Sequence, residues 1–279
     1  ILKCKYEESL KCLQKSLDIS LINQMKLEVG LSYYLMSYVL NNTNNNKQAI
    51  EYLERSINIF KKDTIYVTYL MGAFYQLGNI CFQLQEFDSS LFYYRKVLPA
   101  FEKHNHDTAV GYIWGNIGAI HSKFNHTDSA RLYLNKAIEL LKKNNDYQVL
   151  IIFLVDASRN ELNDNKVNKA LELISQAKML VDRYPQLESS RNVYEQLSKV
   201  YAAMGDYAKA FHYQKEYYTL RDSLVNLDLV TEMANMRTEF EVGQKQAEVD
   251  KLEEINRAQS RTVLMMVIGL LLVSVLLVF

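Results

Sequence analysis

Most of this chain carries hydrophobic side chains with the spacing of amphipathic helices. From residue 1 to about residue 218, stretches of about 14 residues place apolar side chains at every third or fourth position, which is the stripe that a helix buries against its neighbours. Short polar or glycine-containing turns separate these stretches, as at residues 44–46, 125–127 and 205–207. Because such turns end one helix and begin the next, the pattern predicts consecutive helices over this region.

Small residues recur at an almost constant interval of forty positions. One set precedes bulky stretches and comprises Ser9, Ala49, Ser90, Ala130, Ala170 and Ala210. A second set lies twelve positions before the last five of these and comprises Ser37, Gly78, Gly118, Ser158 and Ser198. A period between 20 and 50 residues is typical of repeat architectures. Because a small residue lets two helix backbones approach each other, we predict that paired helices touch at these positions.

The repeated unit resembles the tetratricopeptide repeat, most closely in "FYQLGNICFQLQEFDSSLFYYRKV" (74–97) and "YEQLSKVYAAMGDYAKAFHYQKEY" (194–217). The resemblance implies an all-α, right-handed α-solenoid over residues 1–218, with a lone second helix followed by five helix pairs. The period of about 40 exceeds the usual 34, so we expect the second helices or the connections after them to be longer by about two turns. Pro99 falls within a second helix and is expected to kink or end it.

A different pattern follows the repeats. Residues 219–261 are highly charged, lack turn signals and carry apolar side chains at spacings of three, four and seven. This spacing predicts a long linker helix with weak coiled-coil character, and it leaves a homodimer through this helix open.

The last stretch, "TVLMMVIGLLLVSVLLVF" (262–279), carries no charge. Eighteen helical residues rise about 27 Å, close to the hydrocarbon thickness of a bilayer, which is about 30 Å. We therefore predict a transmembrane helix. The chain begins with Ile1 inside a helix and stops at the end of this span, so we expect a truncated piece of a longer protein.

Composition excludes several other classes of protein. With 49% hydrophobic residues, two prolines and nine glycines, the chain fits neither a disordered nor an all-β protein. Its net charge is zero and no stretch concentrates Lys and Arg, so we expect no nucleic-acid binding by this segment. Cys4 and Cys12 would lie about 12 Å apart on one helix, beyond disulfide reach. Free thiols favour a reducing compartment only slightly.

Catalytic chemistry is not indicated. The chain has no phosphate-binding loop, nucleophile elbow or kinase signature. The only histidine pair with ligand spacing is His104 and His106, which we expect to lie at the opposite end of the solenoid wall from His126. We therefore predict no metal, no cofactor and no enzyme activity for this segment, while the full-length protein could still be a histidine kinase.

Stacked helix pairs instead form a concave groove, lined mainly by the first helix of each pair. Counting from the family pattern, the side chains expected to face it are Tyr34, Tyr38, Tyr75, Asn79, Phe82, Tyr112, Arg159 and Lys199. Aromatic rings and an arginine on rigid helices suit an extended or helical peptide. We therefore predict a peptide- or protein-binding groove. The alternative for several of these tyrosines is packing between repeats.

The order of repeats, charged helix and membrane span resembles the sensor region of Bacteroidetes membrane histidine kinases and helix-turn-helix regulators that contain tetratricopeptide repeats. The resemblance implies a single-pass membrane protein with periplasmic repeats, which bind a partner and relay the signal to a cytoplasmic output domain beyond residue 279. The alternative is a cytosolic scaffold on a C-terminal tail anchor, which the basic flank at Arg257 and Arg261 favours.

Overall fold

The computed structural model describes residues 2–224, 242–243 and 245–257, and its described secondary structure is helical throughout, as the sequence predicts. The helices are α1 (Leu2–Ile22), α2 (Lys26–Asn42), α3 (Asn46–Phe60), the 3-10 helix η1 (Thr64–Tyr66), α4 (Val67–Gln83), α5 (Phe87–Lys103), α6 (Asp107–Lys123), α7 (Thr127–Lys143), α8 (Tyr147–Asn163), α9 (Val167–Arg183) and α10 (Leu187–Ala203). Residues 207–224 and 245–257 are also helical.

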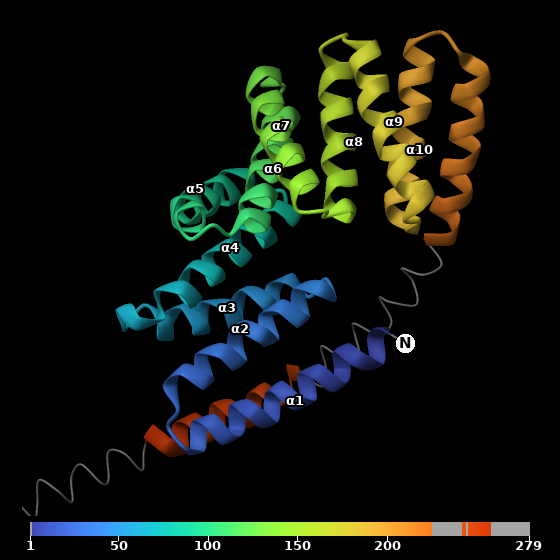
Figure 1. Ribbon diagram of the computed structural model, residues 1–279. Coiled ribbons are helices and arrows are strands. Elements are labelled where there is room, and N and C mark those ends of the chain that lie inside the picture. The colour runs from blue at the N-terminus through green and yellow to red at the C-terminus, as the bar shows by residue number, and fades with distance from the viewer. Residues whose placement is uncertain (1, 225–241, 244, 258–279) are drawn as a thin grey trace, which may run out of the picture. The chain divides into compact units, whose positions relative to one another are not determined.

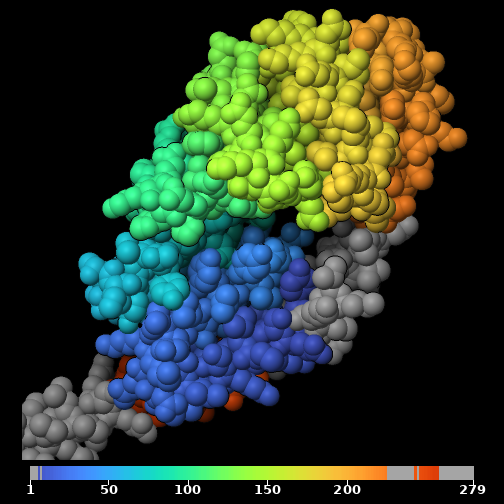
Figure 2. Space-filling view, in the orientation of Figure 1, coloured from blue at the N-terminus to red at the C-terminus, as the bar shows by residue number. Residues whose placement is uncertain are grey.

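The chain forms two compact units, one of residues 1–73 with 231–279 and the other of residues 74–230. In the second unit, helices that follow one another along the chain pack side by side from α6 to α10 (Figures 1 and 2). Their apolar stripes meet in one core, in which Leu134, Leu154, Ile174 and Leu197 are at most 2% exposed. Each helix therefore buries its stripe only against its neighbours, as a repeat protein requires.

The predicted small residues lie where paired helices touch. The Ser90 hydroxyl donates to the carbonyl of Gly78 across 2.9 Å, and the Ser158 hydroxyl donates to the carbonyl of Ala170 across the same distance. Hydroxyl groups can span these gaps only because the two backbones lie close together. At Gly118 the approach is closer still, since a Cβ atom there would lie 2.9 Å from the backbone nitrogen of Leu134.

The longer repeat arises in both helices of each pair. From α4 to α10 every helix has 17 residues, including the first helices, and three residues connect α5 to α6 as well as α6 to α7. The expectation that the second helices or the connections after them alone are longer is therefore wrong. The surplus over a 34-residue repeat is therefore shared by both helices of a pair.

Most turns have one residue in the left-handed conformation. After α6, the N–H of His126 donates to the carbonyl of His121 and the N–H of Asn125 donates to that of Ser122, which is the hydrogen-bond pattern of a Schellman motif. The left-handed residues recur about every twenty positions, at Gln24, Asn44, Gln85, Asn105, Asn125, Asn145, Asn165 and Gly205. Asparagine and glycine tolerate this conformation better than most residues.

Pro99 does not end its helix. The helix α5 continues past Pro99 to Lys103, so of the two expected effects a helix end there is wrong, and a kink stays a prediction. A proline removes one backbone hydrogen bond within a helix. Tyr94 and Val97 are buried before Pro99, and Phe101 after it packs edge-on against Tyr75, so α5 makes contacts on both sides of that gap.

Parts of the predicted C-terminal region lie outside the described residues. The single linker helix over 219–261 stays a prediction, because residues 225–241, 244 and 258–261 lie outside the described residues. The membrane span at 262–279 lies wholly outside them and also stays a prediction. Within residues 2–224, 242–243 and 245–257, no helix combines the length and apolar character that crossing a bilayer requires.

Candidate functional site

The second unit carries two neighbouring hollows at the turns that precede α6 and α8. The first has a volume of about 580 Å³, and its walls include Tyr75, His106, Asp107 and Tyr112. The second has a volume of about 440 Å³, and its walls include Asn145, Asp146, Tyr147 and Tyr184. Because Thr108 and Asn144 line both hollows, the two form one surface trough, which we call the tyrosine trough.

The repeat geometry places equivalent residues in the two hollows. Asn105 and Asn145 lie forty positions apart, and both are left-handed, with φ of 54° and 56°. Each ends a Schellman turn, so the next helix begins two residues later, at Asp107 in α6 and at Tyr147 in α8. A ligand that contacts one hollow therefore meets a similar turn in the next.

Hydrogen bonds and stacking hold the tyrosines of the trough in place. The Tyr112 hydroxyl donates to the carboxylate of Asp146, which also caps α8 by accepting from the N–H of Val149. The Tyr147 hydroxyl donates to Asn145 across 2.6 Å, and the Tyr147 ring stacks on Tyr184 with centroids 5.2 Å apart. These rings are thus preorganised, which lowers the entropy that a ligand must remove on binding.

The trough offers aromatic rings and amides rather than strong charge. Asp107 forms an exposed ion pair with Lys143 across 3.1 Å, and Asp146 is engaged by Tyr112. The other lining side chains are tyrosines, asparagines, one glutamine, one threonine, one alanine and one histidine. Such a wall suits the backbone and the apolar or aromatic side chains of a peptide better than a terminal carboxylate.

The structure brings two of the eight predicted groove residues, Tyr75 and Tyr112, into this trough. Asn79 instead accepts a hydrogen bond across 2.8 Å from the hydroxyl of Tyr94, a fully buried residue of the paired helix. Phe82 is half-buried and packs edge-on against Phe87. Asn79 and Phe82 therefore make contacts between helices.

The other four predicted residues do not line the trough. Arg159 and Lys199 are exposed, and each pairs with a carboxylate of its own helix, Asp156 and Glu195 respectively. Tyr34 and Tyr38 belong to the first unit, where Tyr38 is 55% exposed. The eight-residue groove stays a prediction.

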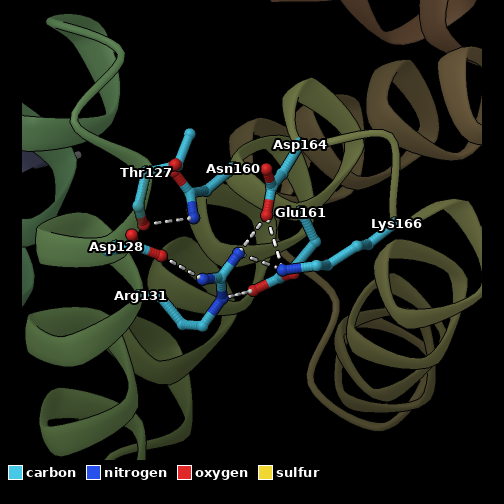
Figure 3. A network of polar contacts seen from close by, with 7 residues as sticks. All are labelled: Thr127, Asp128, Arg131, Asn160, Glu161, Asp164 and Lys166. Atoms are coloured by element: carbon cyan, nitrogen blue, oxygen red, sulfur yellow. Dashed lines mark hydrogen bonds and ion pairs between the residues drawn. The ribbon is translucent and has the colours of Figure 1, made fainter.

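Sequence reasoning missed a partly buried ion network that joins α7 to α8 and to the turn after α8 (Figure 3). The guanidinium of Arg131 contacts Glu161 across 2.6 Å, Asp128 across 2.7 Å, and Asp164. The side chain of Glu161 is only 3% exposed. The pKa of Arg131 is raised mainly by its hydrogen bond to Glu161, with a smaller contribution from the one to Asp164. The pKa of Asp164 is lowered by hydrogen bonds from Lys166 and Arg131. The network joins one repeat to the next.

A second histidine pair was also missed. The Nδ1 atoms of His121 and His126 lie 3.4 Å apart across the Schellman turn after α6. Burial, followed by the neighbouring His126, lowers the pKa of His121. The turn alone creates this pair, because the motif folds residues five apart onto each other. Within the described residues, no group of three or more metal-ligating side chains is present.

Comparison with known proteins agrees with this architecture of paired helices that repeat along the chain. Family models described as tetratricopeptide repeat match residues 69–143 and residues 31–63. A search of curated protein sequences found no match. Tetratricopeptide repeats therefore make up these two stretches of the chain.

Solved structures share the fold at low sequence identity. The chain is similar to BtubC from P. vanneervenii (15% identity, TM-score 0.61), over 78% of this chain and 92% of that one. It is also similar to apo RapI, with 17% identity and a TM-score of 0.57 over 85% of this chain and 66% of that one. A third similar structure is aspartyl phosphate phosphatase F from Bacillus subtilis, with 12% identity and a TM-score of 0.60 over 87% of this chain and 64% of that one. The chain spans slightly less than two thirds of the length of RapI and of phosphatase F. The resemblance to Bacteroidetes sensors stays a prediction.

Proposed function

We propose that this chain is an interaction protein that binds an extended peptide, or an extended segment of a protein, in the tyrosine trough. The observation that carries the proposal is the repetition of one hollow in successive repeats, with preorganised tyrosines in both. Neighbouring packed helices lie about 10 Å apart. A peptide in the extended polyproline-II conformation rises about 3.1 Å per residue and has three residues per turn. Side chains three positions apart in such a peptide lie on one face and therefore match successive hollows.

Removing two rings from the trough is expected to weaken peptide binding at least tenfold. The test selects peptides from a random library on the full chain and measures their affinity by fluorescence anisotropy for wild type and for Tyr75→Ala/Tyr147→Ala. This variant deletes one aromatic anchor from each hollow, and such anchors dominate binding energy.

The matched control is Tyr207→Ala, which removes a ring that is 73% exposed and does not line the trough. Its affinity for the same peptides should equal that of wild type. Equal affinities for all three proteins, each with unchanged helical circular dichroism, would place peptide binding elsewhere or nowhere.

The second part of the proposal concerns the membrane. The uncharged stretch 262–279 supports a tether that holds the repeats at a bilayer, and its arrangement after a charged segment supports relay to an output domain beyond residue 279. We place the repeats in the periplasm of a bacterium. The competing candidate is a cytosolic scaffold on a tail anchor, which Arg257 and Arg261 favour because basic flanks prefer the cytoplasm.

Topology mapping distinguishes the two candidates. Alkaline phosphatase or green fluorescent protein is fused after Ser260 or after Phe279 of the chain expressed in bacteria. We expect phosphatase activity from the fusion at Ser260 and fluorescence from the fusion at Phe279, because the span would put these two sites on opposite sides. The reverse pattern would establish the cytosolic scaffold, and fluorescence from both fusions would exclude a span.

A further inference from the structure

A helical segment near the C-terminus packs against the first repeats of the chain. Residues 245–257 run alongside α1 (Figure 1) and belong to the first unit. The hydroxyl of Tyr33 in α2 donates to Glu253 across 2.6 Å, and Arg55 in α3 donates to Asp250 across 3.0 Å. Near the end of the segment, the Asn256 side chain approaches the carbonyl of Leu21 at 3.5 Å.

The segment presents an apolar and acidic face to these helices. Val249 is completely buried, and the next residues on that face, Leu252 and Glu253, are partly buried. Glu254 and Ile255 are exposed. The pattern is that of an amphipathic helix seated on a receiving surface, here with two carboxylates three positions apart after a valine.

The receiving surface is built to accept carboxylates. The ring of Tyr33 stacks on Tyr52 with centroids 5.8 Å apart, and the guanidinium of Arg55 lies 5.7 Å from the centre of the Tyr33 ring. Burial would lower the pKa of Arg55, but its hydrogen bonds to Asp250 and Tyr33 more than offset this and raise it. The Tyr33 hydroxyl and the Arg55 guanidinium are thus fixed in place to donate to Glu253 and Asp250.

Several features indicate that the docked segment can leave. The ion pair between Arg55 and Asp250 is about half exposed, with side-chain exposures of 36% and 53%, and exposed pairs contribute little to stability. A hollow of about 510 Å³ remains beside Glu253 and Asn256, so the seat is incompletely filled. The polar contacts of Tyr33 and Arg55 around the buried Val249 therefore make the docking of this segment specific but weak.

We propose that the surface formed by α1, α2 and α3 is a recognition site for an acidic amphipathic helix of a partner protein, and that residues 245–257 are its built-in competitor. The site recognises a valine that is followed by carboxylates one and four positions later, as in Val249, Asp250 and Glu253. Tyr33 and Arg55 donate the hydrogen bonds that recognise the two carboxylates. The tyrosine trough plays no part in this recognition.

The test uses the full chain and a fluorescein-labelled peptide of residues 242–257 as the probe. In the variant Asp250→Lys/Glu253→Lys, the tethered competitor is disabled while the receiving surface is unchanged. We expect this variant to bind the peptide at least tenfold more tightly than the wild-type chain does, because a tethered segment competes at an effective concentration of the order of millimolar.

Peptide variants test the chemistry of recognition. A peptide with Asp250→Asn/Glu253→Gln should lose at least tenfold in affinity for the disabled chain, whereas the matched peptide with Glu254→Gln should bind within twofold of wild type because Glu254 faces outward. Adding Arg55→Glu to the disabled chain should abolish binding of the wild-type peptide. In the otherwise wild-type chain, Arg55→Glu should create binding of the Asp250→Lys/Glu253→Lys peptide, because the chain's own acidic segment no longer fits the surface and does not compete.

Hydrogen exchange of residues 245–257 in the full chain supplies an independent measurement. We expect slower exchange in wild type and in Glu254→Gln than in Asp250→Lys/Glu253→Lys, with unchanged circular dichroism. If the disabled chain binds no peptide, or if the segment exchanges equally in all three proteins, the proposed site does not exist. Peptide binding that is indifferent to Arg55→Glu would overturn it equally.

Discussion

Replacing Gly118 with alanine is expected to destabilise the second unit by about 2 kcal/mol. The new Cβ atom would lie 2.7 Å from Cγ of Leu134 and 2.9 Å from its backbone nitrogen, and 3.2 Å from the carbonyl oxygen of Ala130. Two of these obstacles are backbone atoms, so no rotamer change relieves the clash and α6 must move away from α7. Overpacking costs about 3 kcal/mol in such a case, and the better helix propensity of alanine returns about 1 kcal/mol.

Urea denaturation followed by tryptophan fluorescence measures this effect, because the only tryptophan, Trp114, lies in the same helix and packs against the core. The matched control is Gly111→Ala, also in α6, where the new atom would meet only the flexible side chains of Leu141 and Leu140, at 3.3 Å or more. That variant should stay within about 1 kcal/mol of wild type. Equal stability of the two variants would contradict close approach at Gly118.

Replacing Arg131 with methionine is expected to cost about 3 kcal/mol of unfolding free energy. The change keeps the aliphatic stem but removes the guanidinium that neutralises Glu161, whose side chain is 3% exposed. Breaking a buried pair costs about 3–5 kcal/mol because one charge stays buried without a partner. The lower end applies here because the side chain of Arg131 is itself 19% exposed. Urea denaturation at pH 7 gives the value.

Two further variants show whether the buried charge causes the loss. Arg131→Met/Glu161→Gln removes both charges, and we expect it to be more stable than the single variant because no buried carboxylate is left without a partner; Asp128, which also loses its contact with Arg131, is 95% exposed. Lys199→Met breaks an exposed pair with Glu195 and should change stability by about 0.5 kcal/mol or less. The interpretation fails if the double variant is less stable than Arg131→Met.

The network also predicts the direction of one pH effect. Hydrogen bonds from Lys166 and Arg131 lower the pKa of Asp164 below its ordinary value of 3.8. The unfolded chain therefore binds a proton at this carboxylate at a higher pH than the folded chain does. Its contribution to stability is complete above about pH 4 and is lost as the pH falls through the folded pKa.

Much of the fold could be predicted from the chain alone. The positions of Gly78, Gly118 and Ser158 showed where helices pair, because only small residues permit the backbones to touch, and a forty-residue spacing of such residues has no other common cause. The equal lengths of the two helices were missed, although the asparagines at 105, 125, 145 and 165 recur every twenty residues. That signal concerns turn conformation, which hydrophobic periodicity does not report.

The site was predictable only in part. Tyr75 and Tyr112 were identified as surface aromatics of first helices, and both line the trough. Tyr147 and Tyr184 were not identified, because one lies at the start of a helix and the other just past the end of another, where the position within a repeat does not specify which way a ring points. Their stacking depends on how α8 and α9 pack.

The sequence by itself determined the repeat, the helices and the contacts within each pair, because these depend on residues near each other along the chain and on a period that repeats many times. The tertiary structure alone decided the partners of Arg131, the trough built from two turns, and the docking of residues 245–257 on α1 to α3. Apart from the pair of Arg131 with Asp128, these contacts join residues about 30 to more than 200 positions apart. Most of their side chains are charged or polar and, apart from the asparagines of the turns, follow no period, so only packing selects one partner among the many that the chain offers.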